Sequence, residues 1–438
     1  MLWNIPTRDP YPRGFSYIFG GNMNKKRIGV VGAIAAAALA VSALAVPTAF
    51  AAKKSIIIWA DDTRGPALVK IVKDMEKAVP GYTVDVKAYA SYDALGAAWD
   101  KATAATGPDI ILRDGALAIS GAKSGKIQSL VVPSGTRSQF APAAWGAMTV
   151  KGRVFGIPTD VDTTGMIYNT AMFPTAPKTI GDIYDYYIKN KATLTNGICS
   201  FNGVWGAHPV LTALGGGAWG YKGNTPDLTN TLMNSAAFKA NVKKYLLGAD
   251  GKSNGFFPAT DAGCKDNYLA GDVPFAIIGN WEWLDYMEKG FQMNLMPVPG
   301  VKAGTNGNMF GSVSGAMLTT YAAKHGVEAG AKDLLVNFFA STAGAVAYQA
   351  IELRPPAEKG AQAKVEFTAQ VNFGKAGSKA GVPQIGAILN GATGSKGYWD
   401  VLPAYWTEVL VNGKDPKAEA VKLNEFLTKN LQAGAKDL

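Results

Sequence analysis

Histidine and cysteine are scarce in this chain of 438 residues, which has two of each. Two cysteines are too few for a disulfide scaffold or a Cys-rich metal site, and two histidines, His208 and His325, are too few for a multi-histidine site. Charged residues make up only 17% and hydrophobic residues 48%, which excludes intrinsic disorder. We therefore expect a folded protein of two or three domains that needs no metal and no cofactor.

The usual catalytic motifs are also missing. The sequence has no G-x-S-x-G elbow, no G-x-x-x-x-G-K-[ST] loop and no H-E-x-x-H pair. A glycosidase needs two carboxylates on opposite sides of one bond, and Asp162 has several acidic residues as alternative partners. We therefore expect a protein that is not an enzyme, and we keep a secreted carbohydrate-active enzyme as the alternative.

The net charge of +10 is spread along the chain. Residues 1–51 contribute +4 of it, and no run of basic residues after them exceeds two. A nucleic-acid-binding protein should gather its basic residues on one face. The charge pattern therefore indicates no nucleic-acid partner.

The amino-terminal region has the order of a secretory signal peptide. A basic segment at 24–27 precedes an apolar segment at 28–46, and Ala49-Phe50-Ala51 is an A-x-A cleavage site. We expect translation to start at Met23 and the mature chain to start at Ala52, with residues 1–22 as an upstream extension. The product would be exported, soluble, and periplasmic or associated with the cell envelope. An uncleaved membrane anchor is the alternative. Outside the cytoplasm Cys199 and Cys264 could form a disulfide, or they could be two buried thiols.

The rest of the chain alternates between strand and helix patterns. Buried strands are predicted at 55–59 and 109–112, with helices at 67–79 and 92–105 between them. Such alternation predicts an α/β fold with mainly parallel sheets flanked by helices. Ligands bind beyond the carboxyl ends of the strands in such sheets. The candidates at these positions are Asp61, Asp62, Arg64, Arg113 and Asp114.

Three tryptophans complete the candidate site. Trp205, Trp281 and Trp399 each lie among glycine and polar residues instead of in a periodic apolar run. Flat aromatic rings suit the apolar faces of sugars, and carboxylates or arginines suit their hydroxyl rims. Ordinary core packing is the alternative for each ring.

The order of several segments resembles the maltose/maltodextrin-binding proteins, which are family 1 extracellular solute-binding proteins of ABC importers. The similar segments are 107–111, 124–125, 151–158, 167–169, 177–179, 270–272, 279–283 and 381–384. The resemblance implies a two-lobed, type II periplasmic-binding-protein fold with a hinged cleft. The first lobe would be 52–160 with 315–353, and the second 165–310 with 357–438. The hinges would be near 161–164, 311–314 and 354–356.

The resemblance also implies ligand contacts and a function. Asp162 matches the sugar-contacting acidic residue of the family, and Trp205, Trp281 and Trp399 match its stacking rings. The chain departs from the family after the strand at 109–112, where Arg113 and Asp114 stand in place of a Trp and an Asp-Arg pair. The implied protein is a monomer that carries an oligosaccharide to ABC permease subunits. Alternatives are a protein that binds a non-α-glucan sugar and one that binds ferric iron or an anion.

Overall fold

A computed structural model provides the structure of the chain after residue 52. It describes residues 53–200, 203–222, 225–227, 231–258, 263–283, 286, 293–366, 370–374, 381–383 and 397–434. The predicted signal peptide and the predicted start at Met23 lie outside these residues.

Strands and helices alternate along the described chain, as the sequence predicts. The strands are β1 (Lys54–Ala60), β2 (Tyr82–Ala88), β3 (Ile110–Asp114), β4 (Thr149–Val150), β5 (Arg153–Val154), β6 (Ile157–Asn169), β7 (Ile198–Ser200), β8 (Gly220–Lys222), β9 (Thr225–Asp227), β10 (Phe275–Gly279), β11 (Met293–Met296), β12 (Met309–Leu318) and β13 (Gly381–Pro383). The helices are α1 (Arg64–Lys70), α2 (Val72–Ala78), α3 (Tyr92–Asp100), α4 (Gly115–Lys123), α5 (Ser134–Ser138), α6 (Pro142–Ala147), α7 (Ile180–Asn190), α8 (Gly203–Ala213), α9 (Ala236–Leu246), α10 (Cys264–Ala270), α12 (Tyr321–His325), α13 (Glu328–Leu334), α14 (Thr342–Glu352), α15 (Lys359–Gln362), α18 (Tyr398–Trp406) and α19 (Pro416–Gly434), with π-helical turns η1 (Leu335–Phe339) and η2 (Thr407–Val411).

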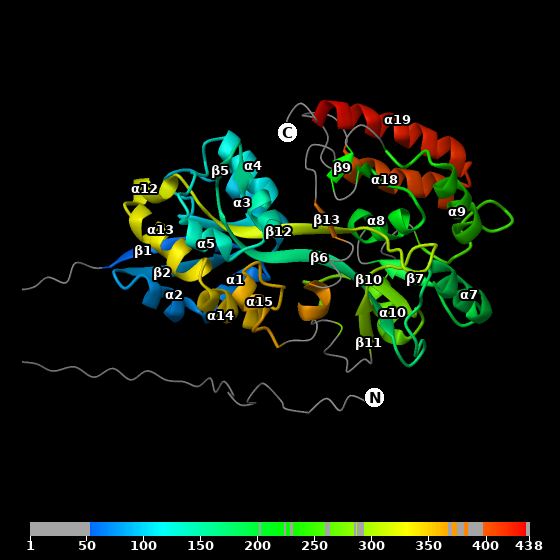
Figure 1. Ribbon diagram of the computed structural model, residues 1–438, viewed down its shortest axis with the longest axis horizontal. Helices are drawn as coiled ribbons and strands as arrows, with labels where there is room; N and C mark the ends of the chain where they lie inside the picture. The colour runs from blue at the N-terminus through cyan, green and yellow to red at the C-terminus, as the bar shows by residue number, and fades with distance from the viewer. Residues whose placement is uncertain are drawn as a thin grey trace, which may run out of the picture. The chain divides into compact units, whose positions relative to one another are not determined.

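Nine of the described strands form one curled sheet in the order β2-β1-β3-β12-β6-β10-β7, with β11 paired to β6 and β13 to β12. Strand β1 is parallel to β2 and β3, and β7 is parallel to β10. Strand β12 is antiparallel to β3 and β6, and β10 and β11 are antiparallel to β6. The pairing is thus more mixed than the sequence indicates, because β6 and β12 run in opposite directions through the middle of the sheet (Figure 1).

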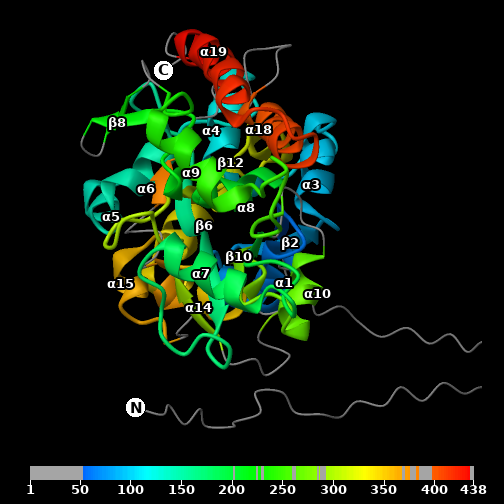
Figure 2. The same cartoon turned by 90° about the vertical axis from the view of Figure 1, so that its right-hand side faces the viewer.

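The sheet joins two hydrophobic cores, which gives the two-lobed fold. Ile157 at the start of β6 packs in the core with β1 and β3, whereas Met166 near its end packs in the core with α7, α8 and α18. Strand β12 passes between the same cores, with Phe310 in one and Leu318 in the other. Helices surround these strands (Figure 2). The two-lobed α/β fold predicted from the sequence is therefore confirmed.

The three predicted crossing segments lie side by side. Val161 pairs with Val313 across β6 and β12. Pro356 forms a bridge with Asp160, and the carbonyl of Pro355 accepts a hydrogen bond from the Val161 amide at 2.9 Å. Strands β6 and β12 thus pass between the two cores side by side, whereas Ala357, just after the third predicted segment, still packs in the core with β1 and β3.

Local signals fix several helix ends. The Ser91 hydroxyl accepts a hydrogen bond from the Ala94 amide at 3.0 Å and caps α3. Thr179 and Asp182 form the predicted capping box of α7. The single helix predicted at 67–79 is instead two helices, because the backbone at Ile71 leaves the helical region.

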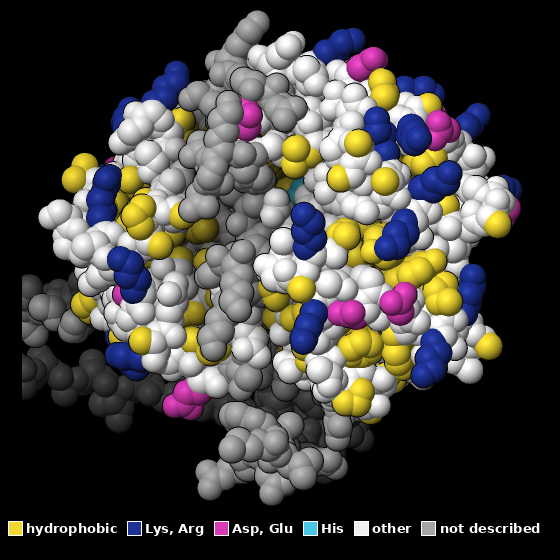
Figure 3. Space-filling view, turned by 45° about the vertical axis from the view of Figure 1, so that its right-hand side comes forward, with side chains coloured by type: hydrophobic (Ala, Val, Ile, Leu, Met, Phe, Trp, Pro, Cys, Tyr) yellow, Lys and Arg dark blue, Asp and Glu magenta, His cyan; other side chains and the backbone are white. Residues whose placement is uncertain are grey.

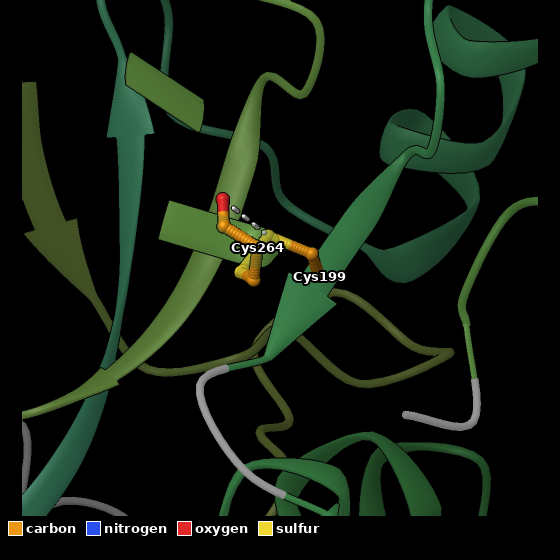
Figure 4. The surroundings of a disulfide bond; sticks show 2 residues. All are labelled: Cys199 and Cys264. Atoms are coloured by element: carbon orange, nitrogen blue, oxygen red, sulfur yellow. Dashed lines mark hydrogen bonds between the residues drawn. A yellow bond between two sulfur atoms is a disulfide. The ribbon is translucent and has the colours of Figure 1, made fainter. Parts of the chain in front are cut away.

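A disulfide joins Cys199 of β7 to Cys264 at the start of α10 (Figure 4). Their Cα atoms are 5.4 Å apart, and 65 positions separate them in the sequence. Both residues are buried beside Tyr268 and Ile278. The disulfide therefore links the edge strand β7 to helix α10.

In the described residues, no single helix is both long enough and apolar enough to cross a membrane. One bent pair of helices, Glu328–Phe339 with Thr342–Glu352, reaches that length and composition when the two are taken together. On the face drawn in Figure 3, lysine and arginine side chains are scattered among uncharged and hydrophobic groups. The positive charge visible on this face is therefore diffuse.

Candidate functional site

One cavity of about 510 Å³ lies where the two cores meet the crossing strands. Its lining comes from the segment after β1, from the start of α3, from the end of β3, from the crossing strands, and from two tryptophans of the second lobe. The lining residues are Asp61, Asp62, Thr63, Arg64, Ser91, Tyr92, Asp93, Asp114, Asp162, Trp205, Trp281, Ser312 and Arg354. This volume is typical of small-molecule sites.

Seven of the nine residues that the sequence singles out line this cavity. They are Asp61, Asp62, Arg64, Asp114, Asp162, Trp205 and Trp281. Arg113 does not line it and lies behind Tyr92, with its guanidinium carbon 3.7 Å from the centre of the tyrosine ring. Trp399 does not line it either, and packs on Phe310 at 5.3 Å between ring centres.

The second lobe presents an aromatic wall. Trp205, near the start of α8, and Trp281, just after β10, meet edge to face with ring centres 5.3 Å apart. Trp205 also packs against Phe310, which is fully buried and backs Trp399. Trp205 and Trp281 themselves are only partly buried. The wall thus has two rings at the cavity and a packed aromatic layer behind them.

Arg64 anchors the floor of the cavity. Its guanidinium pairs with Asp61 at 2.8 Å, with Asp160 at 2.8 Å and with Asp162 at 2.7 Å. It also donates a hydrogen bond to the Ser314 hydroxyl at 2.8 Å. Since Arg64 begins α1 and Ser314 lies on β12, this side chain connects the first lobe to both long crossing strands.

A second buried arginine, Arg354, lies in the segment after α14. Arg354 Nε lies 2.6 Å from Asp162 Oδ1, and its guanidinium also pairs with Glu352. Its Nη2 donates to the Thr63 hydroxyl at 3.1 Å. Arg354 is 3% exposed. Asp162 therefore carries one arginine on each of its carboxylate oxygens.

Burial and ion pairing shift the pKa values of Asp61, Asp162 and Arg64 in opposite directions. Burial would raise the pKa of Asp61 and of Asp162, but Arg64 and Arg354 outweigh it, so both carboxyl pKa values lie below their ordinary value. Burial would lower the pKa of Arg64, but its carboxylate partners raise it. Asp61, Asp162 and Arg64 therefore stay ionised at neutral pH. Both arginines are already paired with carboxylates of the protein.

The first lobe contributes a polar rim. Asp114 accepts a hydrogen bond from the Tyr92 hydroxyl and another from the Ala116 amide at 2.8 Å, which caps α4. Burial raises the pKa of Asp114. Asp62 and Asp93, which also line the cavity, are exposed. The rim therefore offers carboxylate acceptors opposite the aromatic wall.

Sequence reasoning missed several lining residues. The sequence pattern predicts only the start of a helix at Ser91, Tyr92 and Asp93. It predicts only crossing segments at Ser312 and Arg354. A usable signal was present at Tyr92, because an aromatic residue directly after a helix cap, at the carboxyl end of a strand, lies at the ligand edge of the sheet.

Metal ligation and histidine chemistry can both be judged from the described residues, in which the surroundings of His208 are well defined. No group of three or more His, Cys, Asp or Glu side chains in that part of the chain is arranged to hold a metal ion. His208 is stacked on Phe310 and hydrogen-bonded to the Tyr398 hydroxyl, and burial lowers its pKa to about 3. His208 is therefore a neutral core residue.

Comparison with known proteins agrees with this picture. Residues 70–375 match the family described as "Bacterial extracellular solute-binding protein". The chain is 24% identical over 220 residues to the galactooligosaccharide-binding protein of Bacillus subtilis (strain 168), covering 47% of this chain and 51% of that protein. It is 23% identical over 278 residues to the maltodextrin-binding protein MdxE of the same strain, covering 60% of this chain and 65% of that protein. It is 24% identical over 168 residues to the maltotriose-binding protein of Pyrococcus abyssi (strain GE5 / Orsay), covering 37% and 34%. The matches thus span about a third to two thirds of these relatives.

Proposed function

Since the chain belongs to the bacterial extracellular solute-binding proteins, we propose that it is the exported binding subunit of an ABC sugar importer. It would bind maltose, a maltodextrin or a related oligosaccharide in the cavity between the lobes and deliver it to the permease subunits. The observation that carries this proposal is the pairing of two tryptophans on one wall of the cavity with carboxylates on the other.

Sugars match such a cavity for a simple chemical reason. A pyranose ring has apolar C–H groups on its faces and hydroxyl groups around its rim. Trp205 and Trp281 offer flat apolar area for a face, and Asp62, Asp93 and Asp114 offer acceptors for hydroxyl hydrogens. Both arginines in the described lining pair with buried carboxylates, so this part of the cavity offers an anionic ligand no unpaired guanidinium. This favours a neutral saccharide over an anionic solute.

Transport requires capture and release without reaction. We propose that segments 161–164 and 311–314, where β6 and β12 run between the cores, act as hinges, and that the lobes close when a ligand contacts both of them. A ligand shifts this equilibrium only through its greater affinity for the closed state. Residues of both lobes line one cavity, which supports such a differential contact.

A thermal-shift screen of the purified protein against mono-, di- and oligosaccharides tests the proposal. A ligand at one hundred times its Kd stabilises the folded state by about 2.7 kcal/mol. We expect an α-linked glucose oligomer or a related oligosaccharide to raise the Tm, and chromatography to recover it unchanged. Conversion of the ligand would support a carbohydrate-active enzyme. A complete panel without any Tm increase would contradict sugar binding.

Export and oligomeric state have separate tests. Amino-terminal sequencing of the protein recovered outside the cytoplasm should start at Ala52, whereas a retained segment 28–46 would indicate the membrane anchor. Light scattering of the purified mature chain should give the mass of a monomer.

A further inference from the structure

Tyr92 is the one aromatic side chain that the first lobe contributes to the described lining of the cavity. It is the first residue of α3, directly after the Ser91 cap, and it is 42% exposed. Large apolar rings are usually covered in folded proteins, and Tyr92 is the one aromatic residue among the exposed large hydrophobic residues in the described part of the chain. An exposed ring in a ligand cavity offers surface that a ligand can cover.

The ring is held in place by its neighbours. The Arg113 guanidinium carbon lies 3.7 Å from the ring centre and covers one face. Arg113 Nη1 also donates to the Tyr92 carbonyl at 3.3 Å, and the Tyr92 hydroxyl donates to Asp114. Because Arg113 covers one face and Asp114 binds the hydroxyl, a ligand would contact the ring on its opposite face. A ring fixed in this way binds without losing much side-chain freedom.

We propose that Tyr92 is the stacking platform of the first lobe, so that one pyranose ring is held between Tyr92 and the Trp205–Trp281 wall. The inference rests on the proposed function and deepens it. Arg113 and Asp114, the last two residues of β3, then act as positioning residues that orient the tyrosine. This gives a role to Arg113, which does not itself line the cavity.

Contact on both ring faces sets a stereochemical requirement. A pyranose with equatorial hydroxyls, as in glucose, has C–H groups on both faces. The axial O4 of galactose puts a polar oxygen on one face, where an aromatic ring would desolvate it without a partner. The held ring should therefore have the glucose configuration.

Calorimetry with 4-epimeric disaccharides tests this inference. The pairs are cellobiose with lactose, and maltose with its galactose-terminated epimer, alongside the saccharide that gives the largest Tm increase in the panel. We expect the wild type to bind the glucose-configured member about fivefold to tenfold more tightly. Tyr92→Ala should weaken its binding about tenfold and reduce the preference between epimers. Tyr92→Phe, which keeps the ring, should stay within about threefold of the wild type.

Two controls separate stacking from folding. Ile188→Ala removes an exposed apolar side chain of α7 outside the cavity and should leave all affinities unchanged. Sugar C–H protons should shift upfield on binding to the wild type, and this ring-current shift should shrink in Tyr92→Ala.

The outcomes distinguish the inference from the proposed function. If Tyr92→Ala binds saccharides as tightly as the wild type while Trp281→Ala binds them more weakly, the role of Tyr92 is overturned and sugar binding in the cavity still stands. Preference for the galactose-configured member would overturn contact on both faces. A wild type that binds no saccharide of the panel would overturn the proposed function itself.

Discussion

Asp162 and Arg354 form an ion pair with 2.6 Å between Oδ1 and Nε, and they join strand β6 to the segment after α14. The other oxygen of Asp162 pairs with Arg64 at 2.7 Å and accepts a hydrogen bond from Ser314 at 2.8 Å. The resemblance assigns Asp162 a sugar contact, and the carboxylate does line the cavity. Its contacts with both arginines indicate that it also fixes the floor on which a ligand would rest.

Asp162→Asn should lower the free energy of unfolding by about 3 kcal/mol, because it removes a carboxylate charge that two buried guanidinium groups share. Urea unfolding followed by circular dichroism measures this loss. Asp74→Asn breaks the exposed pair with Lys77 and serves as the matched control, with little expected change. Equal stability of Asp162→Asn and the wild type would show that the cluster contributes no net stability.

The pH dependence of stability should report on His325. Its Nδ1 lies 2.7 Å from Asp109 Oδ1 and its Nε2 lies 2.6 Å from the Ala104 carbonyl oxygen, so both nitrogens face acceptors. Burial would lower the pKa of His325, but these partners outweigh it and raise the pKa above its ordinary value. The stabilisation is therefore complete below about pH 6.5, the unfolded value, and is lost as the pH rises through the folded pKa.

Urea unfolding should show that the free energy of unfolding falls as the pH rises from about 5.5 to about 8.5. The variant His325→Asn should show a smaller fall. The other histidine, His208, has a pKa of about 3 and does not titrate in this range. A decrease of the same size in His325→Asn would assign the effect to other groups.

Trp281→Ala should weaken saccharide binding by roughly 1–3 kcal/mol, by analogy with the stacking of bases on aromatic side chains. Gly279→Ala offers a second route to the same loss, because a Cβ at this position would overlap the Trp281 ring and displace it. Calorimetry measures both effects.

The matched control is Gly81→Ala, where a Cβ meets nothing within 4 Å. It should bind like the wild type. If Gly279→Ala folds and binds as tightly as the wild type, the position of the Trp281 ring has no bearing on affinity.

The disulfide should stabilise the second lobe. Removing a cross-link that spans 65 residues costs about 4 kcal/mol in the chain-entropy account. The double variant Cys199→Ser with Cys264→Ser should therefore unfold at lower urea than the wild type. The exported wild type should show no reactive thiol after denaturation without reductant, and two reactive thiols would contradict the bond.

The fold was predictable because its signals are local. Short apolar runs at 55–59 and 109–112 became β1 and β3, and the capping box at Thr179 became the start of α7. The antiparallel pairing of β6 with β12 was not predicted, because it depends on contacts between segments far apart in the sequence. Local patterns carry no information on strand direction across such distances.

The candidate site was only partly predictable for the same reason. Trp205 and Trp281 stood out by their glycine and polar neighbours, and both line the cavity. Arg354 and Tyr92 were missed because their roles depend on Asp162, Thr63 and Arg113, which belong to other elements. Sequence could nominate residues at strand ends, and only the packing of the lobes shows which of them share one cavity.

A crystal structure of the protein with its best-bound saccharide tests the central claim most directly. The account predicts an intact sugar between the lobes, with a ring face on Trp205 or Trp281 and hydroxyls on carboxylates of the first lobe. A saccharide bound elsewhere, with the cavity tryptophans contacting only protein, would contradict it.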